Sequence, residues 1–320
     1  MADKQGWPLV GMGGKFEFVI LDDGSAPGGA WRHGWDSLTL FSPAGYSSLP
    51  GWPMPQAEHA SFPARDDVIA YLTAYETRYN LPVLRPVKVL TVSSAAAGRL
   101  LVATDSGNWL ANTVISASGT WSTSYIPDVL GRTGFNGVQM HSAHYQNAAA
   151  FEGRKVLVVG DGSSGAQIHA ELSQTSDSTW VTQTPPVFLP DDVDGRVLFD
   201  RASAIHRGEH VDGLPISFAN VVMVPPVRTA RDRGDLSTAL MFERMTANGV
   251  KWRDGTSSSV DATIWCTGFR PRYWYFPLSL RVMRAERSRL GIASSMDAAL
   301  FIKRPSRHEE RPPHRGVRAR

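Results

Sequence analysis

The stretch KVLVVGDGSSGAQIHAEL, Lys155–Leu172, lies near the middle of the chain and predicts a buried strand, a glycine-rich turn and the start of a helix. Gly160, Gly162 and Gly165 form the pattern G-x-G-x-x-G. The first glycine permits a tight turn, the second lets the backbone approach a pyrophosphate, and the third lets the helix pack against the strand. Because the pattern stands between an apolar run and a helix, we predict a dinucleotide site; an incidental glycine turn is the alternative.

The strand after this helix helps to distinguish the two nicotinamide nucleotides. Its end, WVTQTPP, places Thr182, Gln183 and Thr184 where an NAD site usually has an acid for the ribose 2′-hydroxyl. The lack of an acid there favours NADP, although no arginine for a 2′-phosphate lies at this point either. We therefore expect NADPH.

The composition is that of a globular chain with a basic end. Of 320 residues, 42% are hydrophobic and 20% charged, and the length predicts about two domains. Residues 281–320 hold eleven of the 33 basic but four of the 30 acidic residues, so the rest of the chain has more acids than bases. We expect no nucleic-acid-binding body, and we interpret the tail as a disordered terminus rather than an RNA- or membrane-binding arm.

Other features bound the kind of protein and its surroundings. The sequence has no apolar run of transmembrane length, no secretory signal, and Cys266 as its single cysteine, so we predict a cytoplasmic protein without membrane contact. HRGEH, His206–His210, has the spacing of a zinc peptidase, but Gly208 interrupts the helix and no third ligand is evident. No metal site is expected, and the oligomeric state stays open.

Strand-like and helical patterns alternate along the chain. FEFVILDD (16–23) predicts a strand ending in two acids, and apolar residues between Asp66 and Tyr79 recur on one helical face. Three strand-like runs around 83–92, 99–104 and 109–117 are separated by turns, and DATIWCTGF (261–269) is a later strand. These patterns predict an α/β fold with a small antiparallel element.

Between these elements, Phe135, Gly137, His141 and Tyr145 spell F-x-G-x-x-x-H-x-x-x-Y in FNGVQMHSAHY. This resembles the fingerprint of the flavin-dependent class B monooxygenases, which are the flavin-containing monooxygenases and their Baeyer–Villiger relatives. PGGAWRHGWDSLTLF, SLPGWPMP, SASGTW and WCTGFRP resemble further motifs of that family, in the same order. The similarity runs from about Phe16 to Pro271.

The resemblance implies a domain organisation. In this family an FAD domain is interrupted by an NADPH domain, so a central glycine motif is the second of two. The implied fold is α/β, with two Rossmann-like dinucleotide-binding domains that have parallel sheets and a small antiparallel β element in the first. The implied segments are 1–150 (first part of an incomplete FAD-binding-like domain), 151–262 (NADP-binding domain), 263–280 (return to the FAD-like domain) and 281–320 (basic tail).

The resemblance also implies which residues contact the nucleotides, with Asp22 at the adenosine ribose of FAD. The expected cofactor contacts are Asp22, Gly28, Gly29, Trp31, Arg32, Asp36, Gly119, Phe135, Gly137, His141, Tyr145, Gly160, Gly162, Ser163, Ser164, Gly165, Thr267 and Gly268. The catalytic residues stay unknown, because in such enzymes the flavin performs the chemistry.

The implied reaction inserts one oxygen atom from O2 into a small organic substrate through a flavin hydroperoxide, with NADPH as reductant. Two alternatives stay open: an NADP(H)-binding remnant without a working flavin site, and an NADPH oxidase or reductase on the same scaffold. Phe41 stands where many members have an asparagine near the flavin, and the substrate is not named by the sequence.

Near its start the sequence departs from the family pattern. In GMGGKFEFVILDD only Lys15 separates the last glycine from the strand at Phe16, so no helix fits between them. After CTGFRP the sequence departs again, where the family continues with a glycine-rich strand and helix. We therefore expect FAD to be bound weakly or not at all.

Overall fold

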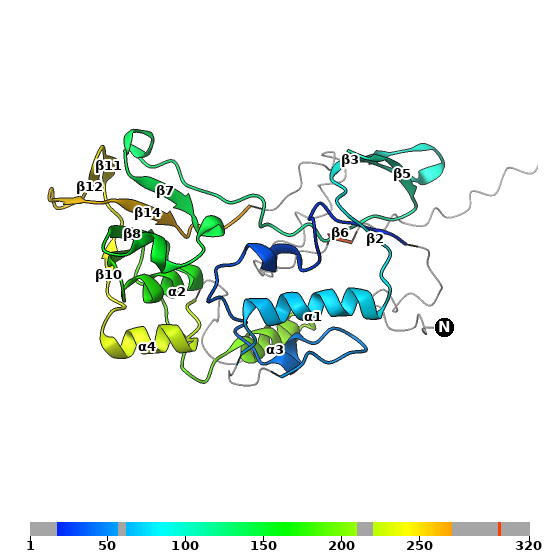
Figure 1. The fold of residues 1–320 in the computed structure, drawn as a ribbon, viewed down its shortest axis with the longest axis horizontal. Helices are drawn as coiled ribbons and strands as arrows, with labels where there is room; N and C mark the ends of the chain where they lie inside the picture. Colours follow the sequence, from blue (N-terminus) through cyan, green and yellow to red (C-terminus); the bar gives the residue numbers. More distant parts are fainter. Residues whose placement is uncertain (1–17, 57–61, 210–219, 271–299, 302–320) are drawn as a thin grey trace, which may run out of the picture.

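The computed structural model describes residues 18–56, 62–209, 220–270 and 300–301. Within them a five-stranded sheet with its helices lies at one end, a small antiparallel sheet lies at the other, and the long helix α1 (Arg65–Arg78) lies between them (Figure 1). Of the basic tail expected at 281–320, only Leu300–Phe301 falls inside the described residues.

The larger sheet is parallel throughout. Its strands are β7 (Val138–His141), β8 (Lys155–Val159), β9 (Asp177–Thr182), β10 (Thr238–Leu240) and β14 (Ala262–Trp265), in the order β10-β9-β8-β14-β7. Helix α2 (Ser163–Leu172) joins β8 to β9, and α4 (Pro225–Arg233) precedes β10. The predicted strand, turn and helix of a Rossmann-like domain are confirmed. β7 comes before residue 150 and β14 continues past residue 262, so this one sheet crosses both of the expected segment boundaries.

The apolar run of β8 is buried on both faces of this sheet. Val156 and Val158 belong to one core cluster, and Leu157 and Val159 belong to another. Successive side chains of a strand point to opposite faces, so a run such as KVLVV suits a strand covered on both sides. The pattern in the sequence therefore reflects the position of β8 in the middle of the sheet.

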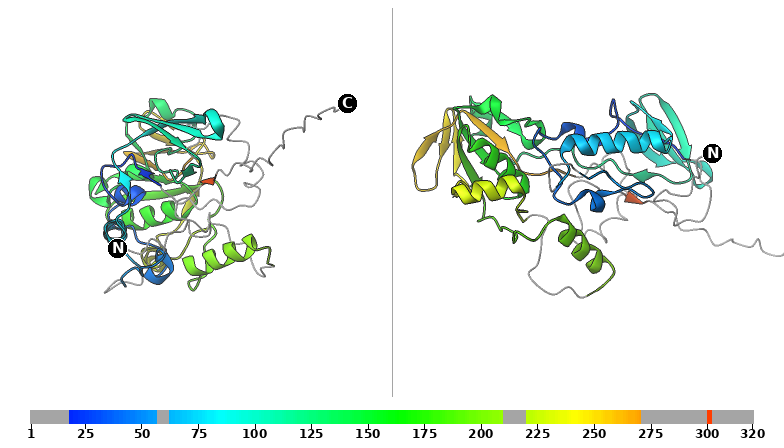
Figure 2. Two further views of the ribbon diagram at one scale, coloured as in Figure 1. Left: turned by 90° about the vertical axis from the view of Figure 1, so that its right-hand side faces the viewer. Right: turned by 60° about the horizontal axis from the view of Figure 1, so that its bottom comes forward.

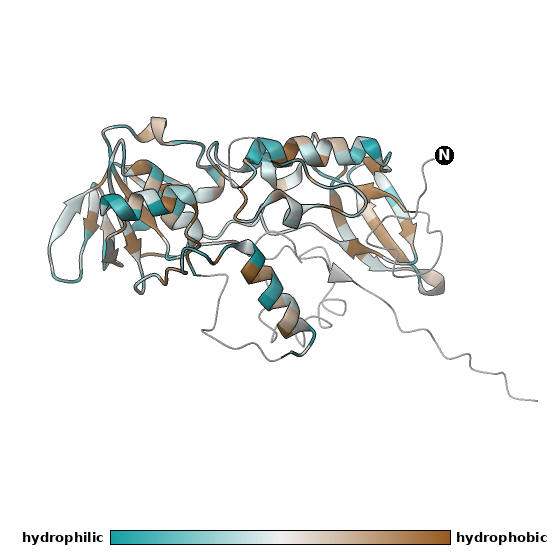
Figure 3. Cartoon of the chain, turned by 90° about the horizontal axis from the view of Figure 1, so that it is seen from below, coloured by the Kyte–Doolittle hydropathy of each residue, from teal (hydrophilic) through white to brown (hydrophobic). Residues whose placement is uncertain are grey.

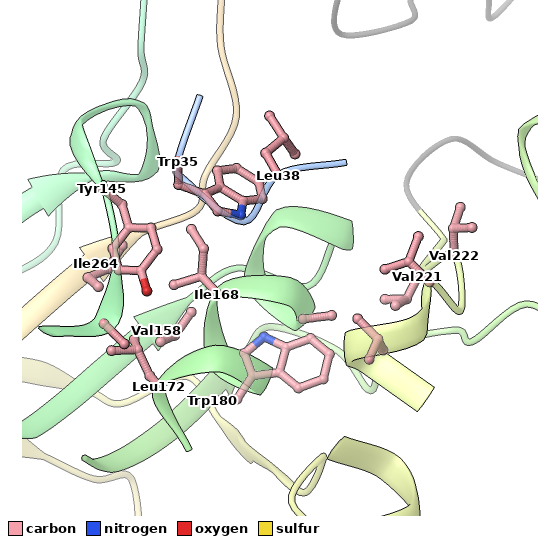
Figure 4. Packing of buried hydrophobic residues seen from close by; sticks show 14 of the residues in the cluster. Trp35, Leu38, Tyr145, Val158, Ile168, Leu172, Trp180, Val221, Val222 and Ile264 are labelled. Carbon is pink, nitrogen blue, oxygen red and sulfur yellow. The ribbon is translucent and has the colours of Figure 1, made fainter. Parts of the chain in front are cut away.

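The first face is covered by α2 and by a segment from the N-terminal part of the chain. Ile168 and Leu172 of α2 are fully buried, and Trp35 and Leu38 pack into the same cluster (Figure 4). In Figure 4 the indole of Trp35 lies over Ile168. The N-terminal part and the Rossmann-like domain thus share one core.

The second face is covered by a small antiparallel sheet. Its strands are β11 (Arg244–Thr246), β12 (Gly249–Lys251) and β13 (Ser257–Ser259). Met245 and Val250 pack in the cluster that also holds Leu157 and Val159. The indole of Trp252 meets the ring of Phe242 edge-on, at 6.2 Å between centroids.

The N-terminal part contains the other sheets. β1 (Ile20–Leu21) pairs in parallel with β2 (Val83–Leu84), and β3 (Val89–Ser94), β4 (Leu100–Thr104) and β5 (Gly107–Ala111) form an antiparallel sheet. β6 (Ile115–Ser116) pairs with β15 (Leu300–Phe301). The expected parallel pairing and small antiparallel element in this part are both confirmed. The short 3₁₀ helices are η2 (Gly29–His33), η3 (Ala44–Ser47), η4 (Ala96–Gly98), η5 (Arg132–Gly134), η6 (Ser142–His144) and η7 (Ala148–Phe151).

The helices carry both hydrophilic and hydrophobic residues, as surface helices do (Figure 3). In α1, Val68, Tyr71 and Tyr75 are buried at helical spacing, and the carboxylate of Asp67 accepts a hydrogen bond from the Ala64 amide at 2.9 Å. This helix begins and ends one residue earlier than its sequence pattern predicts. None of the helices in the described ranges is long and apolar enough to cross a membrane.

Helix α3 (Gly195–His206) stands apart from the five-stranded sheet (Figure 2). It packs instead on the N-terminal part, where the rings of Phe41 and Phe199 stack and the Tyr46 hydroxyl donates to the Asp200 carboxylate at 2.6 Å. The sequence pattern did not predict this helix.

Two segments join the N-terminal part to the Rossmann-like domain, and they run side by side. The Tyr125 amide donates to the Gly268 carbonyl at 3.0 Å, and the Arg270 amide donates to the Thr123 carbonyl at 2.8 Å. The guanidinium of Arg270 also lies 3.9 Å from the ring centroid of Tyr125. These contacts fix the end of β14 against the segment that leads to β7.

Gly165 tests whether the fold needs the close contact of α2 with β8. A Cβ there would lie 2.4 Å from the Gly160 carbonyl oxygen, so Gly165→Ala should lower the free energy of unfolding by about 1–3 kcal/mol, despite the roughly 1 kcal/mol that alanine gains in helix propensity. Gly134→Ala is the control, because a Cβ at Gly134 meets nothing within 4 Å. Urea unfolding of both variants measures the difference; equal stability would contradict the close contact.

Candidate functional site

The candidate site lies at the carboxyl edge of the five-stranded sheet. The chain leaves β8 toward β9 and β10 on one side, whereas β14 and β7 lie on the other, so β8 and β14 flank a topological switch point. In open α/β sheets, ligands bind outside the carboxyl ends of the strands at such a point. The residues found there are Gly160 after β8, Thr182 ending β9, Cys266 after β14 and His141 ending β7.

Gly160 is held from three sides. Its amide donates to the Val181 carbonyl at 2.9 Å, and its carbonyl accepts the indole N–H of Trp180 at 2.6 Å. Its φ of +143° disfavours other residues, and a Cβ would lie 2.3 Å from the carbonyl oxygen of Cys266. The turn after β8 is therefore fixed by its neighbours and admits only glycine here.

Gly162 differs from Gly160 in what its backbone requires. Its φ of −95° and ψ of −177° are extended values that any residue adopts. It is the N-cap of α2, and no side chain of the described residues caps the amides of the first turn. Open amides at a helix N-terminus form an anion site, so a glycine here leaves room for a phosphate.

The two serines between the glycines take different positions. The Ser163 hydroxyl donates to the Asn220 carbonyl at 3.2 Å and accepts from the Val222 amide at 3.3 Å, which fixes the segment before α4 beside the turn. Ser164 is half-buried in the first turn of α2. The structure thus brings the five expected contacts of the glycine motif to one end of the sheet. They are Gly160, Gly162, Ser163, Ser164 and Gly165.

His141 connects β7 to the turn after β14. Its Nδ1 accepts from the Ala143 amide at 3.1 Å, so its Nε2 is the protonated nitrogen that donates to the Gly268 carbonyl at 2.9 Å. The ring meets Phe269 edge-on, and Phe269 stacks on Trp121. Burial lowers the pKa of His141, so the ring is neutral at pH 7.

The other fingerprint residues pack inside the domain. Phe135 lies in the cluster on one face of the sheet, and the fully buried Tyr145 lies in the cluster on the other. A Cβ on Gly137 would lie 2.3 Å from the Phe135 ring. The side chains of Phe135 and Tyr145 are therefore covered by their neighbours and hold the two ends of the β7 segment against the sheet.

The residues expected at FAD lie in the N-terminal part. Asp22 follows β1; its carboxylate accepts from Arg85 Nε at 2.7 Å and from the Gly24 amide at 2.9 Å. Gly28 and Gly29, with φ of +110° and +51°, open η2 beside α1. Gly119, Thr267 and Gly268 lie in the two joining segments, where the Thr267 hydroxyl donates to the Tyr125 carbonyl.

A cavity of about 470 Å³ brings together two of the residues expected at FAD, Arg32 and Asp36. It is lined by Arg32, Asp36, Arg65, Asp66, Ile69, Ala70 and Gln146. The carboxylate of Asp36 accepts from Asn147 at 2.8 Å and from Arg65 at 2.9 Å, and these hydrogen bonds lower its pKa. Trp31 is half-buried and packs against the clusters on both sides of this region.

The two implied cofactors fit the described residues unequally. The β8–α2 turn offers a nicotinamide nucleotide open amides at a switch point. For FAD, the described residues supply the Asp22 carboxylate and a polar cavity, but among them β8–α2 is the only strand and glycine turn that open a helix. For a metal, the described residues contain no cluster of three His, Cys, Asp or Glu; His210 lies outside them, and the side chain of His206 is not described.

Arg253 is a candidate residue that the sequence did not predict. A second cavity, of about 400 Å³, is lined by Gln183, Thr184, Leu240, Met241 and Arg253. The sequence predicts no arginine at the end of β9, yet the turn between β12 and β13 brings Arg253 there. No local pattern signals this, because the two segments are far apart in the chain.

Comparisons with known proteins agree with this fold. Residues 14–198 match the family model described as pyridine nucleotide-disulphide oxidoreductase. The structure of a flavin-containing monooxygenase from Stenotrophomonas maltophilia is 50% identical, with a TM-score of 0.72 over 80% of this chain and 72% of that one. The structure of a cyclohexanone monooxygenase, at 16% identity and a TM-score of 0.58 over 78% of this chain and 68% of that one, shares the fold.

The sequence is also similar to those of curated oxidoreductases and monooxygenases. The uncharacterized oxidoreductase CzcO of Bacillus subtilis (strain 168) is 28% identical over 264 residues, which are 81% of this chain and 76% of that protein. The indole-3-pyruvate monooxygenase YUCCA1 of Oryza sativa subsp. japonica is 27% identical over 79% of this chain and 70% of its own length. The chain belongs to the pyridine nucleotide-disulphide oxidoreductase family and, within it, to the flavin-dependent monooxygenases.

Replacing Gly162 tests the nucleotide site. Gly162→Val should fold, since its backbone is extended, but it would put a side chain where the pyrophosphate approaches, so we expect a loss of NADP⁺ affinity of at least about tenfold. Isothermal titration calorimetry of the wild type and the variant measures this. Equal affinity in the two proteins would contradict the site.

His141 predicts a pH dependence of stability. Its folded pKa is lowered, whereas the unfolded chain keeps the ordinary value of about 6.5, so the unfolded state binds more protons below that pH. The free energy of unfolding should therefore decrease as the pH falls below about 6.5. His141→Gln should reduce the slope of the free energy of unfolding against pH. We assign the slope that remains to His169, because burial lowers its pKa as well. Urea unfolding between about pH 5 and 7.5 measures it; an unchanged slope in the variant would contradict the assignment.

Proposed function

We propose that this chain is an NADPH-dependent oxidoreductase of the flavin monooxygenase type, which inserts one oxygen atom from O2 into a small organic substrate. The observation that supports it most is the β8–α2 turn, where Gly160 is fixed by three neighbours and the amides of α2 are open. Membership of the flavin-dependent monooxygenases supplies the reaction type.

In this proposal the residues at the carboxyl edge bind and orient the nicotinamide nucleotide. Gly160 to Gly165 would hold its pyrophosphate, with Ser163 fixing the neighbouring segment. Neutral His141 is a positioning residue, because its hydrogen bond to Gly268 holds the end of β14 beside β7. When bound, a flavin would take electrons from NADPH and react with O2. The single cysteine, Cys266, suits the reducing cytoplasm in which we place the protein.

The FAD side of the proposal rests on fewer contacts. Asp22, Gly28, Gly29, Trp31, Arg32, Asp36, Gly119, Thr267 and Gly268 are the proposed FAD contacts. The described residues among these include no phosphate-binding turn, and the Asp22 carboxylate divides its hydrogen bonds between Arg85 and the Gly24 amide. These observations favour weak binding of FAD, and they also support the second candidate function, an NADP(H)-binding protein that does not use a flavin.

Flavin content separates the two candidate functions. After purification without added cofactor, we expect much less than one FAD per chain upon heat release. Each charged hydrogen bond that the pyrophosphate lacks would weaken binding by about 1.5–3 kcal/mol, which is roughly 10- to 150-fold. Near-stoichiometric FAD would contradict the expectation of weak binding.

Activity with added FAD tests the reaction. NADPH oxidation and O2 uptake should both require added FAD, and an organic sulfide or a ketone should gain one oxygen atom, as detected by mass spectrometry. Hydrogen peroxide formed in place of an oxygenated product would indicate an oxidase on this scaffold. NADP⁺ binding without any FAD-dependent O2 uptake would indicate the nucleotide-binding protein.

A further inference from the structure

The cavity beside the ends of β9 and β10 combines an apolar side with polar groups and a positive charge. Leu240 and Met241 form an apolar side, and Leu240 leaves 60% of its surface exposed. Gln183 and Thr184 add an amide and a hydroxyl, and Arg253 adds a positive charge. None of these five described residues is acidic, so an anion entering the cavity meets no carboxylate in its lining.

The cavity is placed where the nucleotide ribose is expected. β9 lies next to β8, and the Gly160 amide donates to the Val181 carbonyl, so the end of β9 adjoins the turn proposed for the pyrophosphate. In Rossmann folds the residues after this strand contact the 2′ position of the adenosine ribose. A dinucleotide with its pyrophosphate at the turn would therefore direct its 2′ substituent toward this cavity.

The turn that holds Arg253 is closed by hydrogen bonds. The Trp252 amide donates to the Thr256 carbonyl at 2.9 Å, and the Trp252 indole donates to the Ser258 hydroxyl at 2.8 Å. The Trp252 ring packs on the buried Phe242, just after β10. Because Phe242 follows the cavity residues Leu240 and Met241, the turn is fixed beside the cavity that Arg253 lines.

The guanidinium of Arg253 is also unengaged, in contrast to those of two other arginines of this domain. Arg231 and Arg233 form ion pairs with Asp191 and Asp235. Within the described part of the chain, no hydrogen bond or ion pair involves the side chain of Arg253. Oδ1 of its neighbour Asp254 accepts instead from the Thr256 amide and hydroxyl, at 2.9 and 2.6 Å.

We propose that Arg253, from the β12–β13 turn, binds the 2′-phosphate of NADP(H) and so sets the preference of this chain for NADP(H) over NAD(H). The inference rests on the proposed function, since it needs a nicotinamide nucleotide at the β8–α2 turn. Guanidinium groups suit phosphate because their planar N–H donors match its oxygens. Gln183 and Thr184 provide further polar contacts in the same cavity.

The test compares NADP⁺ and NAD⁺ by calorimetry on the full chain. Arg253→Ala should weaken NADP⁺ binding by about 10- to 100-fold, as expected for the loss of a charged hydrogen bond, and change NAD⁺ binding by less than about threefold. Arg253→Lys keeps the charge without the planar donors, so its NADP⁺ affinity should lie between those of wild type and Arg253→Ala. Retained NAD⁺ binding in each variant shows that the fold is intact.

Arg244→Ala is the matched control. Arg244 is exposed on β11 opposite Lys251 and does not line the cavity. Its replacement by alanine removes the same charge from the same small sheet. It should leave the ratio of NADP⁺ to NAD⁺ affinity unchanged. Three outcomes would overturn the role of Arg253 but not the proposed function. These are an equal loss of affinity for both nucleotides in Arg253→Ala, no loss in that variant, or the same loss in Arg244→Ala. A wild-type chain that binds neither nucleotide would overturn the proposed function and this inference together.

Discussion

The peptide of Gly160 is the contact on which the rest of the structure depends. Its amide is bonded to β9, its carbonyl accepts the Trp180 indole, and the space of its missing side chain is taken by the backbone of Cys266 after β14. The missing side chain of Gly165 lets α2 approach the same carbonyl. One peptide unit therefore sets the relative positions of β8, β9, β14 and α2.

This constraint links the fold to the site. Because α2 is held close to β8, its N-terminus opens at the carboxyl edge of the sheet, where the amides face a potential phosphate. Trp35 and Leu38 from the N-terminal part pack on the outer side of α2, so the same helix joins the two parts of the chain (Figure 4). The hydrogen bond between His141 and Gly268 holds the end of β7 beside the segment that follows β14.

The sequence predicted those elements whose patterns are local. The KVLVV run, the glycine motif and the apolar period of 66–79 each lie within one element, and β8, α2 and α1 appear where expected. The strand predicted at 16–23 shortens to Ile20–Leu21 within the described residues, and α3 was not predicted because its partners, Phe41 and Tyr46, lie far away in the chain. Phe135 and Tyr145 match a cofactor fingerprint, yet their roles in packing depend on which face of the sheet each side chain takes. Arg253 reaches the end of β9 only through the pairing of β11, β12 and β13, which no spacing in the sequence specifies.

The most direct measurement is a crystal structure of this chain with NADP⁺. We expect the pyrophosphate within hydrogen-bond distance of the first-turn amides of α2, beside Gly160 and Gly162, and the adenosine at the ends of β9 and β10. A nucleotide bound elsewhere on the chain, with the first turn of α2 free, would contradict the assignment of this edge as the nucleotide site.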